Sequence, residues 1–482
     1  MIYHSTRNTS LVADSCRAVL EGLAPDGGLY VPQQLPQFDW KKCLDGSSIQ
    51  MSIDILSALL PDIPDMPQLV KKAYENKFET EDLTPTVTVG DFAVLELFRG
   101  PTCAFKDVAL SVLPRLLTTA KKQCGVDEDI MILTATSGDT GKAALEGFKD
   151  VDGIRICVFY PDGGVSPVQR KQMVTQEGRN VTVCAVKGNF DDAQTGVKNI
   201  FNSFRSKELP FKLSSANSIN IGRLAPQVMY YFRAYADLVN KGTINLGDRV
   251  NFSVPTGNFG DILAGYIAKQ FGLPVGKLIC ASNANNVLTD FIRTGVYDKR
   301  RQLLKTQSPS MDILVSSNLE RMLYMLSGDC SLVAQLMQQL NKDGIYTLPE
   351  DLKEKIQEQF WAGCCDDENC RKVINKVWTT HHYLCDPHTA VGWAAAEEYQ
   401  QTTNDKTPMV VLSTASPYKF PAAVLQALGD ENSCADEFRQ MEKLFVQTGV
   451  KIPHMLANLE NKTEIHTSVI PKEEMPQFVL SL

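Results

Sequence analysis

Several features that define other classes of protein are missing from this sequence. No apolar run approaches the roughly 20 residues that a membrane-spanning helix needs, and the opening MIYHSTRNTS lacks the apolar stretch of a secretory signal. The 48 basic and 56 acidic residues are interspersed, with a net charge of −8. No sustained basic stripe is therefore available to bind nucleic acid or an anionic membrane. These absences favour a cytoplasmic protein that acts on small molecules.

The cysteines and histidines show no regular ligand spacing. The thirteen cysteines are an odd number and are scattered along the chain, which suits a reducing compartment rather than a disulfide framework. Cys364, Cys365 and Cys370 lack a second pair at zinc-ligand spacing. The crowded stretch HHYLCDPHTA, residues 381–390, is not spaced regularly enough for four ligands around one ion. No metal site is predicted.

The composition is that of an ordinary globular protein, with 482 residues of which 44% are hydrophobic and 22% charged. A chain of this length is expected to form more than one domain. The first ninety or so residues are helical segments broken by Pro- and Gly-rich turns, as at 24–36. From Phe92 onward, apolar runs alternate with small-residue loops and helical periodicity. We therefore predict an N-terminal helical cap region, residues 1–93, followed by an α/β catalytic region, residues 94–482.

Three strand–loop–helix units are clear in this second region. They are DIMILTA, TSGDTG and KAALEGF at 129–148; the unit that begins with IRICVFY at 154; and RVNFSV, PTGNFGD and ILAGYIAKQFG at 249–272. Their strands are apolar without alternation, as expected for a parallel sheet covered on both faces. The fold class predicted is α/β, built on parallel strands.

Two of the loops are suited to anions. The glycine-containing turn at 256–260 leads into a helix, so its backbone N–H groups and the helix dipole fit a phosphate, although a simple turn explains the same residues. The loop at 136–141 adds the hydroxyls of Ser137 and Thr140 and suits a carboxylate, but its Asp139 is unfavourable for an anion. Together the loops fit a ligand with a phosphate at one end and a carboxylate at the other.

Lys106 is a candidate nucleophile. It lies in RGPTCAFKDVALS, after the strand-like VLELF and at the start of an apolar helical run. Desolvation lowers the pKa of a lysine and yields the neutral amine that attacks an aldehyde. Most lysines are solvated surface charges, so spacing alone leaves both interpretations open.

Six motifs resemble those of threonine synthases of the fungal and bacterial kind and, more closely, those of the animal threonine synthase-like proteins. In the family's order, they are YHSTRN with AVLEGLAPDGGLYVP, GPTCAFKD, TATSGDTG, PTGNFGD, DPHTAVG and LSTASPYKF. The resemblance covers nearly the whole chain. It implies the tryptophan-synthase-like fold type II of pyridoxal-phosphate enzymes, with two α/β subdomains of parallel or mixed sheets. It also implies pyridoxal 5'-phosphate as cofactor, a phosphorylated amino acid as substrate and, as a family-level expectation only, a homodimer.

The resemblance assigns roles residue by residue. Lys106 becomes the catalytic lysine that binds the cofactor and moves protons, and Thr414 the hydroxyl partner of the pyridine nitrogen. Arg223 is the candidate for the substrate phosphate, although a structural salt bridge at a helix start explains it equally well. The other expected contacts are, for the cofactor, Gly257, Asn258, Phe259, Gly260 and Asp261, and, for the substrate, Ser137, Asp139 and Thr140.

The sequence departs from the family pattern near these elements. The family's histidine before GPT is Arg99, its SINWAR reads SINIGR with Ile221 and Gly222, and its STAHPAKF reads STASPYKF with Ser416 and Tyr418. Arg99 is thereby a second candidate for phosphate. The departures affect controlled addition of water more than loss of phosphate. We therefore expect a phospho-lyase that converts O-phosphohomoserine-like substrates, and also beta-phosphorylated ones such as O-phosphothreonine, to 2-oxobutyrate and ammonia. True threonine synthesis and a catalytically silent binding protein are the alternatives.

Overall fold

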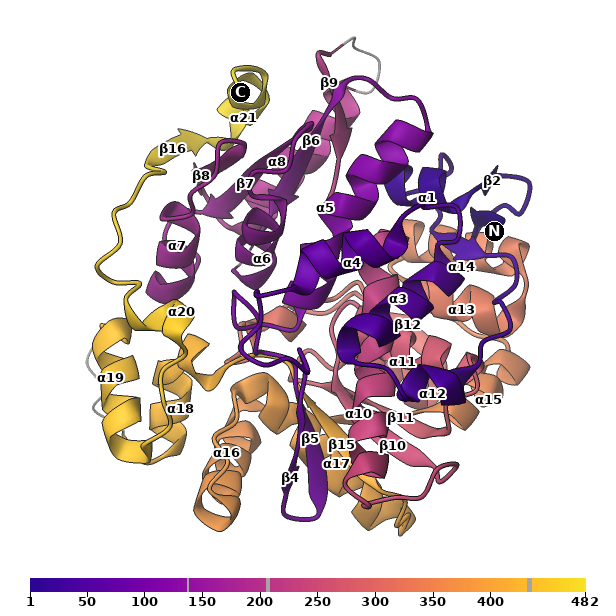
Figure 1. Cartoon of the computed structure of the whole chain (residues 1–482), viewed down its shortest axis with the longest axis vertical. Helices are drawn as coiled ribbons and strands as arrows, with labels where there is room; N and C mark the ends of the chain where they lie inside the picture. The colour runs from indigo at the N-terminus through magenta and orange to yellow at the C-terminus, as the bar shows by residue number, and fades with distance from the viewer. Residues whose placement is uncertain (137, 205–208, 431–435) are drawn as a thin grey trace.

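Two β-sheets organise the molecule, as a computed structural model shows for residues 1–136, 138–204, 209–430 and 436–482 (Figure 1). The large sheet has the order β14 (Phe360–Cys364), β11 (Val275–Ser282), β10 (Val250–Pro255), β15 (Met409–Ser413), β5 (Phe92–Glu96) and β4 (Thr86–Val89). Its strands are parallel except β4, which pairs antiparallel with β5. The small sheet is all parallel, in the order β16 (Ser468–Pro471), β8 (Val181–Lys187), β7 (Ile154–Pro161), β6 (Asp129–Ala135) and β9 (Phe211–Ser214). The predicted α/β class with parallel and mixed sheets is confirmed.

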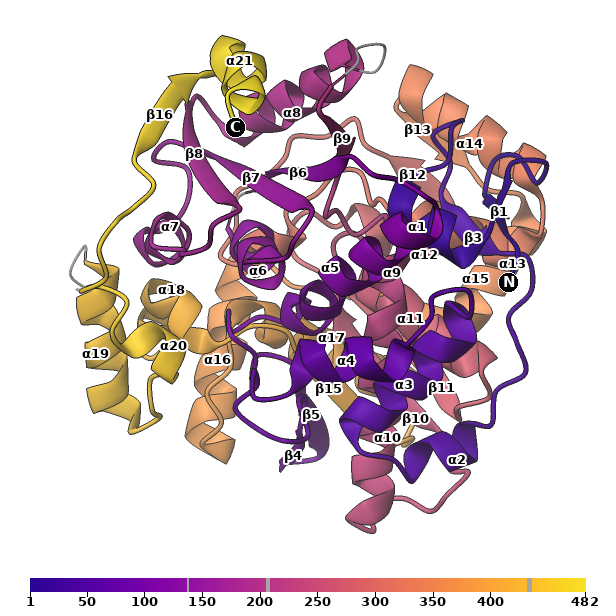
Figure 2. The ribbon, with the colours of Figure 1, turned by 45° about the horizontal axis from the view of Figure 1, so that its top comes forward.

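The small sheet is covered on both faces, which explains its apolar strands. On β7, Ile156 and Val158 enter the core that the sheet shares with α5 (Lys106–Gln123) and α6 (Asp139–Phe148). Cys157 and Phe159 enter a second core with α8 (Phe190–Phe204) and α21 (Met475–Leu480). Figure 2 shows α6 and α8 on opposite sides of this sheet. The strands predicted at 129 and 154 begin at these residues.

The large sheet is also covered on both faces. One face packs against α10 (Val228–Asn240) and α11 (Gly260–Gln270), in the same core as α5. The other packs against α16 (Asp367–His381), α17 (Pro387–Thr403) and α18 (Pro421–Ala427). Asp386 caps α17 by accepting from the N–H of His388 and of Thr389, both at 3.0 Å, so the helix begins within the DPHTAVG motif.

The N-terminal region is mainly helical but also contains a three-stranded antiparallel sheet. Its elements are β1 (Tyr3–Ser5), β2 (Val12–Ala13), α1 (Ser15–Glu21), β3 (Tyr30–Pro32), α2 (Trp40–Leu44), α3 (Ser48–Leu59) and α4 (Met66–Tyr74). Helices α1 and α4 pack on α5. The predicted boundary at residue 93 falls inside β5, whose hairpin with β4 belongs to the large sheet.

The C-terminal segment returns to the small sheet. After α19 (Glu437–Thr448) and α20 (His454–Ala457), the chain runs to the edge of β8, where it pairs as β16 and ends in α21 (Figure 1). The remaining elements are α7 (Pro167–Val174), α9 (Ile221–Leu224), α12 (Val287–Thr294), β12 (Val296–Asp298), α13 (Leu319–Ser327), α14 (Cys330–Lys342), β13 (Ile345–Thr347) and α15 (Glu350–Gln359). Within the described ranges, no helix has the length and apolar character needed to cross a bilayer.

Candidate active site

Backbone contacts fix the loop that carries Lys106, the first residue of α5. The N–H of Phe105 donates to the carbonyl of Thr414 (2.9 Å), and the hydroxyl of Tyr230 donates to the carbonyl of Phe105 (2.5 Å). Because Thr414 directly follows β15, Lys106 lies at the carboxyl end of the large sheet. This is where ligands bind in open α/β sheets.

The Lys106 amine is unpaired and poised for deprotonation. Within the described part of the chain, it makes no hydrogen bond or ion pair, and its Nζ lies 4.8 Å from the centroid of the Phe105 ring. Burial lowers the pKa of Lys106 to about 8; the charge of Asp139 opposes this shift, while those of Lys419 and Arg223 reinforce it. The amine is therefore available in its neutral, nucleophilic form near physiological pH.

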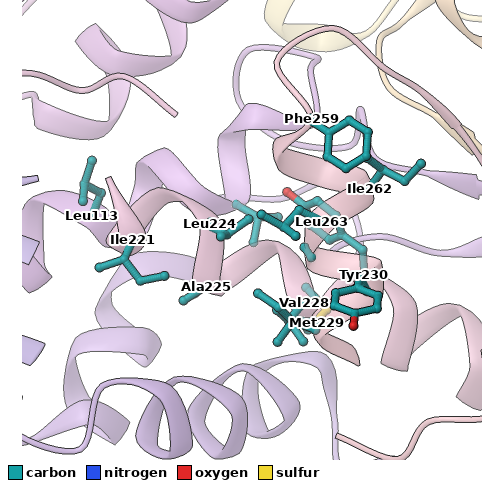
Figure 3. Close-up of a cluster of buried hydrophobic side chains, with 14 of the residues drawn as sticks. Leu113, Ile221, Leu224, Ala225, Val228, Met229, Tyr230, Phe259, Ile262 and Leu263 are labelled. Atoms are coloured by element: carbon teal, nitrogen blue, oxygen red, sulfur yellow. The ribbon is translucent and has the colours of Figure 1, made fainter. Parts of the chain in front are cut away.

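The predicted phosphate loop, residues 257–261, joins β10 to α11. The backbone N–H groups of these residues donate to no acceptor within the described ranges. Phe259 adopts the left-handed conformation with φ 59°, and its ring is buried beside Ile262 in the hydrophobic cluster of Figure 3. Packing of the ring thus stabilises a backbone conformation that is unfavourable for a non-glycine residue. A cradle of free amides at the start of an 11-residue helix fits a phosphate.

Hydrogen bonds from a neighbouring segment fix the carbonyl groups of this loop. The hydroxyl of Ser316 donates to the carbonyl of Gly257 (2.8 Å), and the N–H of Asn318 donates to the carbonyl of Asn258 (3.0 Å). A Cβ at position 257 would lie 3.0 Å from the carbonyl oxygen of Ser310. The close approach leaves little room for a side chain, so an alanine at position 257 would force the backbone at Ser310 to shift by a few tenths of an ångström.

Asp261 and Thr414 both keep a side-chain oxygen without a partner in the described part of the chain, Oδ2 of Asp261 and the hydroxyl of Thr414. The carboxyl of Asp261 accepts from the Tyr231 hydroxyl (3.2 Å), and burial raises the pKa of Asp261 to about 7. Thr414 is 5% exposed, and its hydroxyl makes no hydrogen bond in the described part of the chain. The backbone of Thr414 contacts the Lys106 loop at Phe105. A free hydroxyl at this position suits the predicted contact with a ring nitrogen.

The second anion-suited loop precedes α6. The hydroxyl oxygen of Thr136 accepts from the N–H of Gly138 and of Gly141, both at 3.0 Å. Thr140 is half-buried, and its hydroxyl has no partner among the described residues. Ser137, also predicted to contact the substrate, lies outside the described residues.

Asp139 has a cationic partner that the sequence analysis did not identify. Its carboxylate lies 2.5 Å from Nζ of Lys419 and accepts from Nε2 of Gln169 (3.0 Å). Lys419 is only 1% exposed and ends the short 3-10 helix Pro417–Lys419. The lysine is visible in the motif LSTASPYKF, but nothing in its spacing indicates Asp139 as its partner.

Arg223 is a buried cation without a counter-charge. It is 2% exposed, and no carboxylate pairs with it in the described part of the chain. One guanidinium nitrogen donates to the carbonyl of Ala216, while Nε has no partner. Burial lowers the pKa of Arg223 to about 10. The alternative of a structural salt bridge thus finds no partner, and an unpaired buried guanidinium is costly unless an anion binds it.

Arg99 and Ser416 occupy the positions where the family pattern has histidine. Arg99 pairs with Glu96 (2.6 Å) and with Glu79 (3.3 Å), so it is already neutralised. The hydroxyl oxygen of Ser416 accepts from the N–H of Tyr418 (3.3 Å). Neither residue supplies a base at neutral pH, because a guanidinium stays protonated and a serine hydroxyl is only a weak base.

His388, from the crowded HHYLCDPHTA stretch, is enclosed by protein partners. Its Nδ1 lies 2.6 Å from Asp386, and its Nε2 accepts from the N–H of Ser310 (3.2 Å). Both ring nitrogens are thereby occupied, which gives this histidine a structural role at the start of α17.

Comparisons with known proteins agree with this architecture. Family models described as "Threonine synthase N terminus" and "Threonine synthase, C-terminal" match residues 2–74 and 389–474. The solved "PLP bound Threonine synthase from Brucella melitensis" is 38% identical, with a TM-score of 0.87, and the match covers 100% of this chain and 99% of that one. The yeast threonine synthase structure is 33% identical, with a TM-score of 0.89 and coverage of 99% and 98%. The fold is thus fold type II, the tryptophan-synthase-like class.

Sequence relatives define the family. Threonine synthase of Saccharomyces cerevisiae is 38% identical over 465 residues, 89% of each chain, and that of Pseudomonas aeruginosa is 38% identical over 473 residues, 95% of this chain and 97% of the other. The chain belongs to the threonine synthase family. Threonine synthase-like 1 of Homo sapiens is 42% identical over 434 residues, which are 85% of this chain but 57% of that protein. This chain therefore spans little more than half the length of that animal relative.

Proposed function

We propose that this protein binds pyridoxal 5'-phosphate and removes phosphate from gamma-phosphorylated amino acids such as O-phosphohomoserine, releasing 2-oxobutyrate and ammonia. The observation that carries the proposal is the buried guanidinium of Arg223, which has no carboxylate partner among the described residues and is close enough to lower the pKa of Lys106. A site that keeps a cation unpaired beside a neutral amine suits a substrate with both an anionic group and a carbon acid.

Three features of the site fit the cofactor. The Lys106 amine is free to bind an aldehyde, the amides of 257–261 are free to bind a phosphate, and the Thr414 hydroxyl is free to bind a ring nitrogen. When bound, the cofactor supplies a conjugated ring that withdraws electrons from the substrate. A neutral hydroxyl, rather than a carboxylate, at Thr414 keeps the ring nitrogen largely unprotonated. The "PLP bound" title of the Brucella relative supports the same cofactor.

The protein's own side chains bind the substrate and transfer its protons. Arg223 binds the substrate phosphate through its guanidinium, and the loop of Asp139 and Thr140 faces the substrate carboxylate. Lys106, whose pKa burial lowers to about 8, takes a proton from the alpha carbon and then one from the beta carbon, and it returns protons to the product. Phosphate leaves from the gamma carbon. The balance is one substrate and one water giving 2-oxobutyrate, ammonia and phosphate.

Elimination is favoured over threonine formation because the two described residues that replace histidines of the family pattern, Arg99 and Ser416, supply no imidazole to direct water to the beta carbon. Arg99 is held by Glu96 and Glu79, and Ser416 by the N–H of Tyr418. Loss of phosphate needs proton transfer by Lys106 alone. We expect beta-phosphorylated substrates such as O-phosphothreonine to react as well, because their elimination needs proton removal at the alpha carbon only, one proton transfer fewer than loss of a gamma phosphate.

True threonine synthesis is the second candidate, because the yeast and Pseudomonas relatives, both 38% identical, carry the name threonine synthase. One assay separates the candidates. The cofactor-loaded protein is incubated with O-phosphohomoserine and, separately, O-phosphothreonine, and phosphate, 2-oxobutyrate and threonine are quantified together. We expect equimolar phosphate and 2-oxobutyrate from both substrates.

Other outcomes of this assay have definite meanings. Threonine as the main product from O-phosphohomoserine would contradict the proposed lyase activity and show that the protein is a threonine synthase. A protein that stays colourless after incubation with the cofactor and releases no phosphate would instead be a silent binding protein, because the Lys106 amine would then serve no chemistry.

A further inference from the structure

The carboxylate of Asp139 presents an electrostatic problem. It begins α6, and it lies in the loop that, under the proposed function, receives the substrate carboxylate. Two carboxylates in one loop repel each other, and the burial of Asp139, which is 6% exposed, strengthens the repulsion because little water screens it. An uncompensated Asp139 would therefore exclude the ligand that the loop is suited to bind.

Lys419 removes this obstacle. Its Nζ lies 2.5 Å from Oδ1 of Asp139 and donates to the carbonyl of Thr102 (3.1 Å). Neither side chain is accessible, with exposed fractions of 0% and 3% for Lys419 and Asp139. The remaining donors to the carboxylate are Nε2 of Gln169 (3.0 Å) and the hydroxyl of Ser310 (3.5 Å). The pair is therefore buried, and its two opposite charges sum to zero.

We propose that Lys419 is a positioning residue that makes the α6 loop able to bind the substrate's carboxylate, by pairing with Asp139 and neutralising its charge. The inference deepens the proposed function, on which the identity of the substrate carboxylate rests. Lys419 acts through Asp139 and does not itself contact the substrate. This explains how a loop with an acidic residue serves an anion.

A purely structural role for the pair makes a different prediction. Lys419 follows the large-sheet strand β15, and Asp139 follows the small-sheet strand β6, so the pair also ties the two sheets together. If the tie were the only role, removing either partner would weaken ligand binding alike. If the charge matters, the two removals have opposite effects, because one leaves an extra anion and the other an extra cation.

The test uses the cofactor-loaded protein and an amino acid without a phosphate. Binding of 2-aminobutyrate is measured by calorimetry in the wild type, Lys419→Met, Asp139→Asn and the double variant, with 1-aminopropane as the matched ligand that lacks only the carboxylate. We expect Lys419→Met to weaken the binding of 2-aminobutyrate by at least about tenfold. Asp139→Asn should bind this ligand as tightly as the wild type or more tightly. The double variant should return to within about threefold of the wild type. Binding of 1-aminopropane should change little in any variant.

Equal weakening of 2-aminobutyrate binding in both single variants and in the double variant would overturn the inference. So would a loss of 1-aminopropane binding in Lys419→Met that is as large as the loss of 2-aminobutyrate binding. If Lys419→Met does not fold, the comparison of Asp139→Asn with the double variant decides, because the former must bind the carboxylate more tightly. The outcome is separate from the proposed function. A wild type that binds 2-aminobutyrate in this pattern but releases no phosphate from O-phosphohomoserine would refute the lyase and leave the role of Lys419 intact.

Discussion

Replacing Arg223 with methionine should stabilise the substrate-free protein while removing its affinity for phosphate. Burial lowers the pKa of Arg223 from 12.5 to about 10, so folding disfavours the cation at every pH below about 10, and this penalty fades as the pH rises through that value. At neutral pH the penalty is roughly 3 kcal/mol, at 1.36 kcal/mol per pKa unit. Losing the hydrogen bond to the Ala216 carbonyl costs about 1–2 kcal/mol in return. The net gain expected is about 1–2 kcal/mol.

The assay compares urea unfolding of the wild type and Arg223→Met, both loaded with cofactor so that the 257–261 loop is filled. The variant should have the higher midpoint in the absence of phosphate. Inorganic phosphate should raise the midpoint of the wild type only, because a ligand stabilises the folded state that binds it. The kcat/KM for O-phosphohomoserine should fall about 100-fold, from the loss of roughly 3 kcal/mol of charge-assisted hydrogen bonds. A variant that is less stable yet responds normally to phosphate would show that Arg223 is structural.

The remaining predictions concern the amine, the phosphate loop and Arg99. Lys106→Ala should abolish both the visible absorption of the cofactor-loaded protein and phosphate release; retained turnover would assign the chemistry to another residue. In the cofactor-free protein, labelling of Lys106 by an amine-reactive reagent should rise with pH and reach its midpoint near pH 8, because its pKa is about 8 and the neutral form reacts; a midpoint near 10.5, its ordinary value, would contradict the burial argument. Gly257→Ala should weaken cofactor binding about tenfold, since the new Cβ meets Ser310 at 3.0 Å, whereas at Gly260 the nearest atom is 3.5 Å away and the same change serves as the control. Arg99→Gln should leave the KM for O-phosphohomoserine within about threefold, because Arg99 is already neutralised; a larger rise would make Arg99 a phosphate ligand.

Features with a local cause are predictable from this sequence. Apolar runs of seven or eight residues became β6 and β7 because a parallel sheet buries both faces of each strand. The start of α5 at Lys106 and the turn at 256–260 follow from the residues immediately around them. Each of these elements is specified within a few positions of the chain.

Features that depend on contacts between distant parts of the chain cannot be predicted from this sequence. The ion pair of Asp139 with Lys419 joins segments that follow strands of different sheets, and no periodicity connects them. The sequence also does not indicate that Arg223 has no carboxylate partner among the described residues, since this depends on every segment that surrounds it. A change of composition predicts a boundary at residue 93, whereas the hairpin of β4 and β5 extends the large sheet across that change.

The return of the chain to the small sheet has a consequence for any shortened form of the protein. A chain that stops before Ser468 would lose β16 and uncover the edge of β8, whose backbone groups would then be open to pairing with another molecule. It would also strip α21 from the core that contains Phe159 and Cys157. Such a fragment would keep every residue of the candidate site and still be prone to self-association, so loss of activity on truncation would not by itself locate catalysis in the tail.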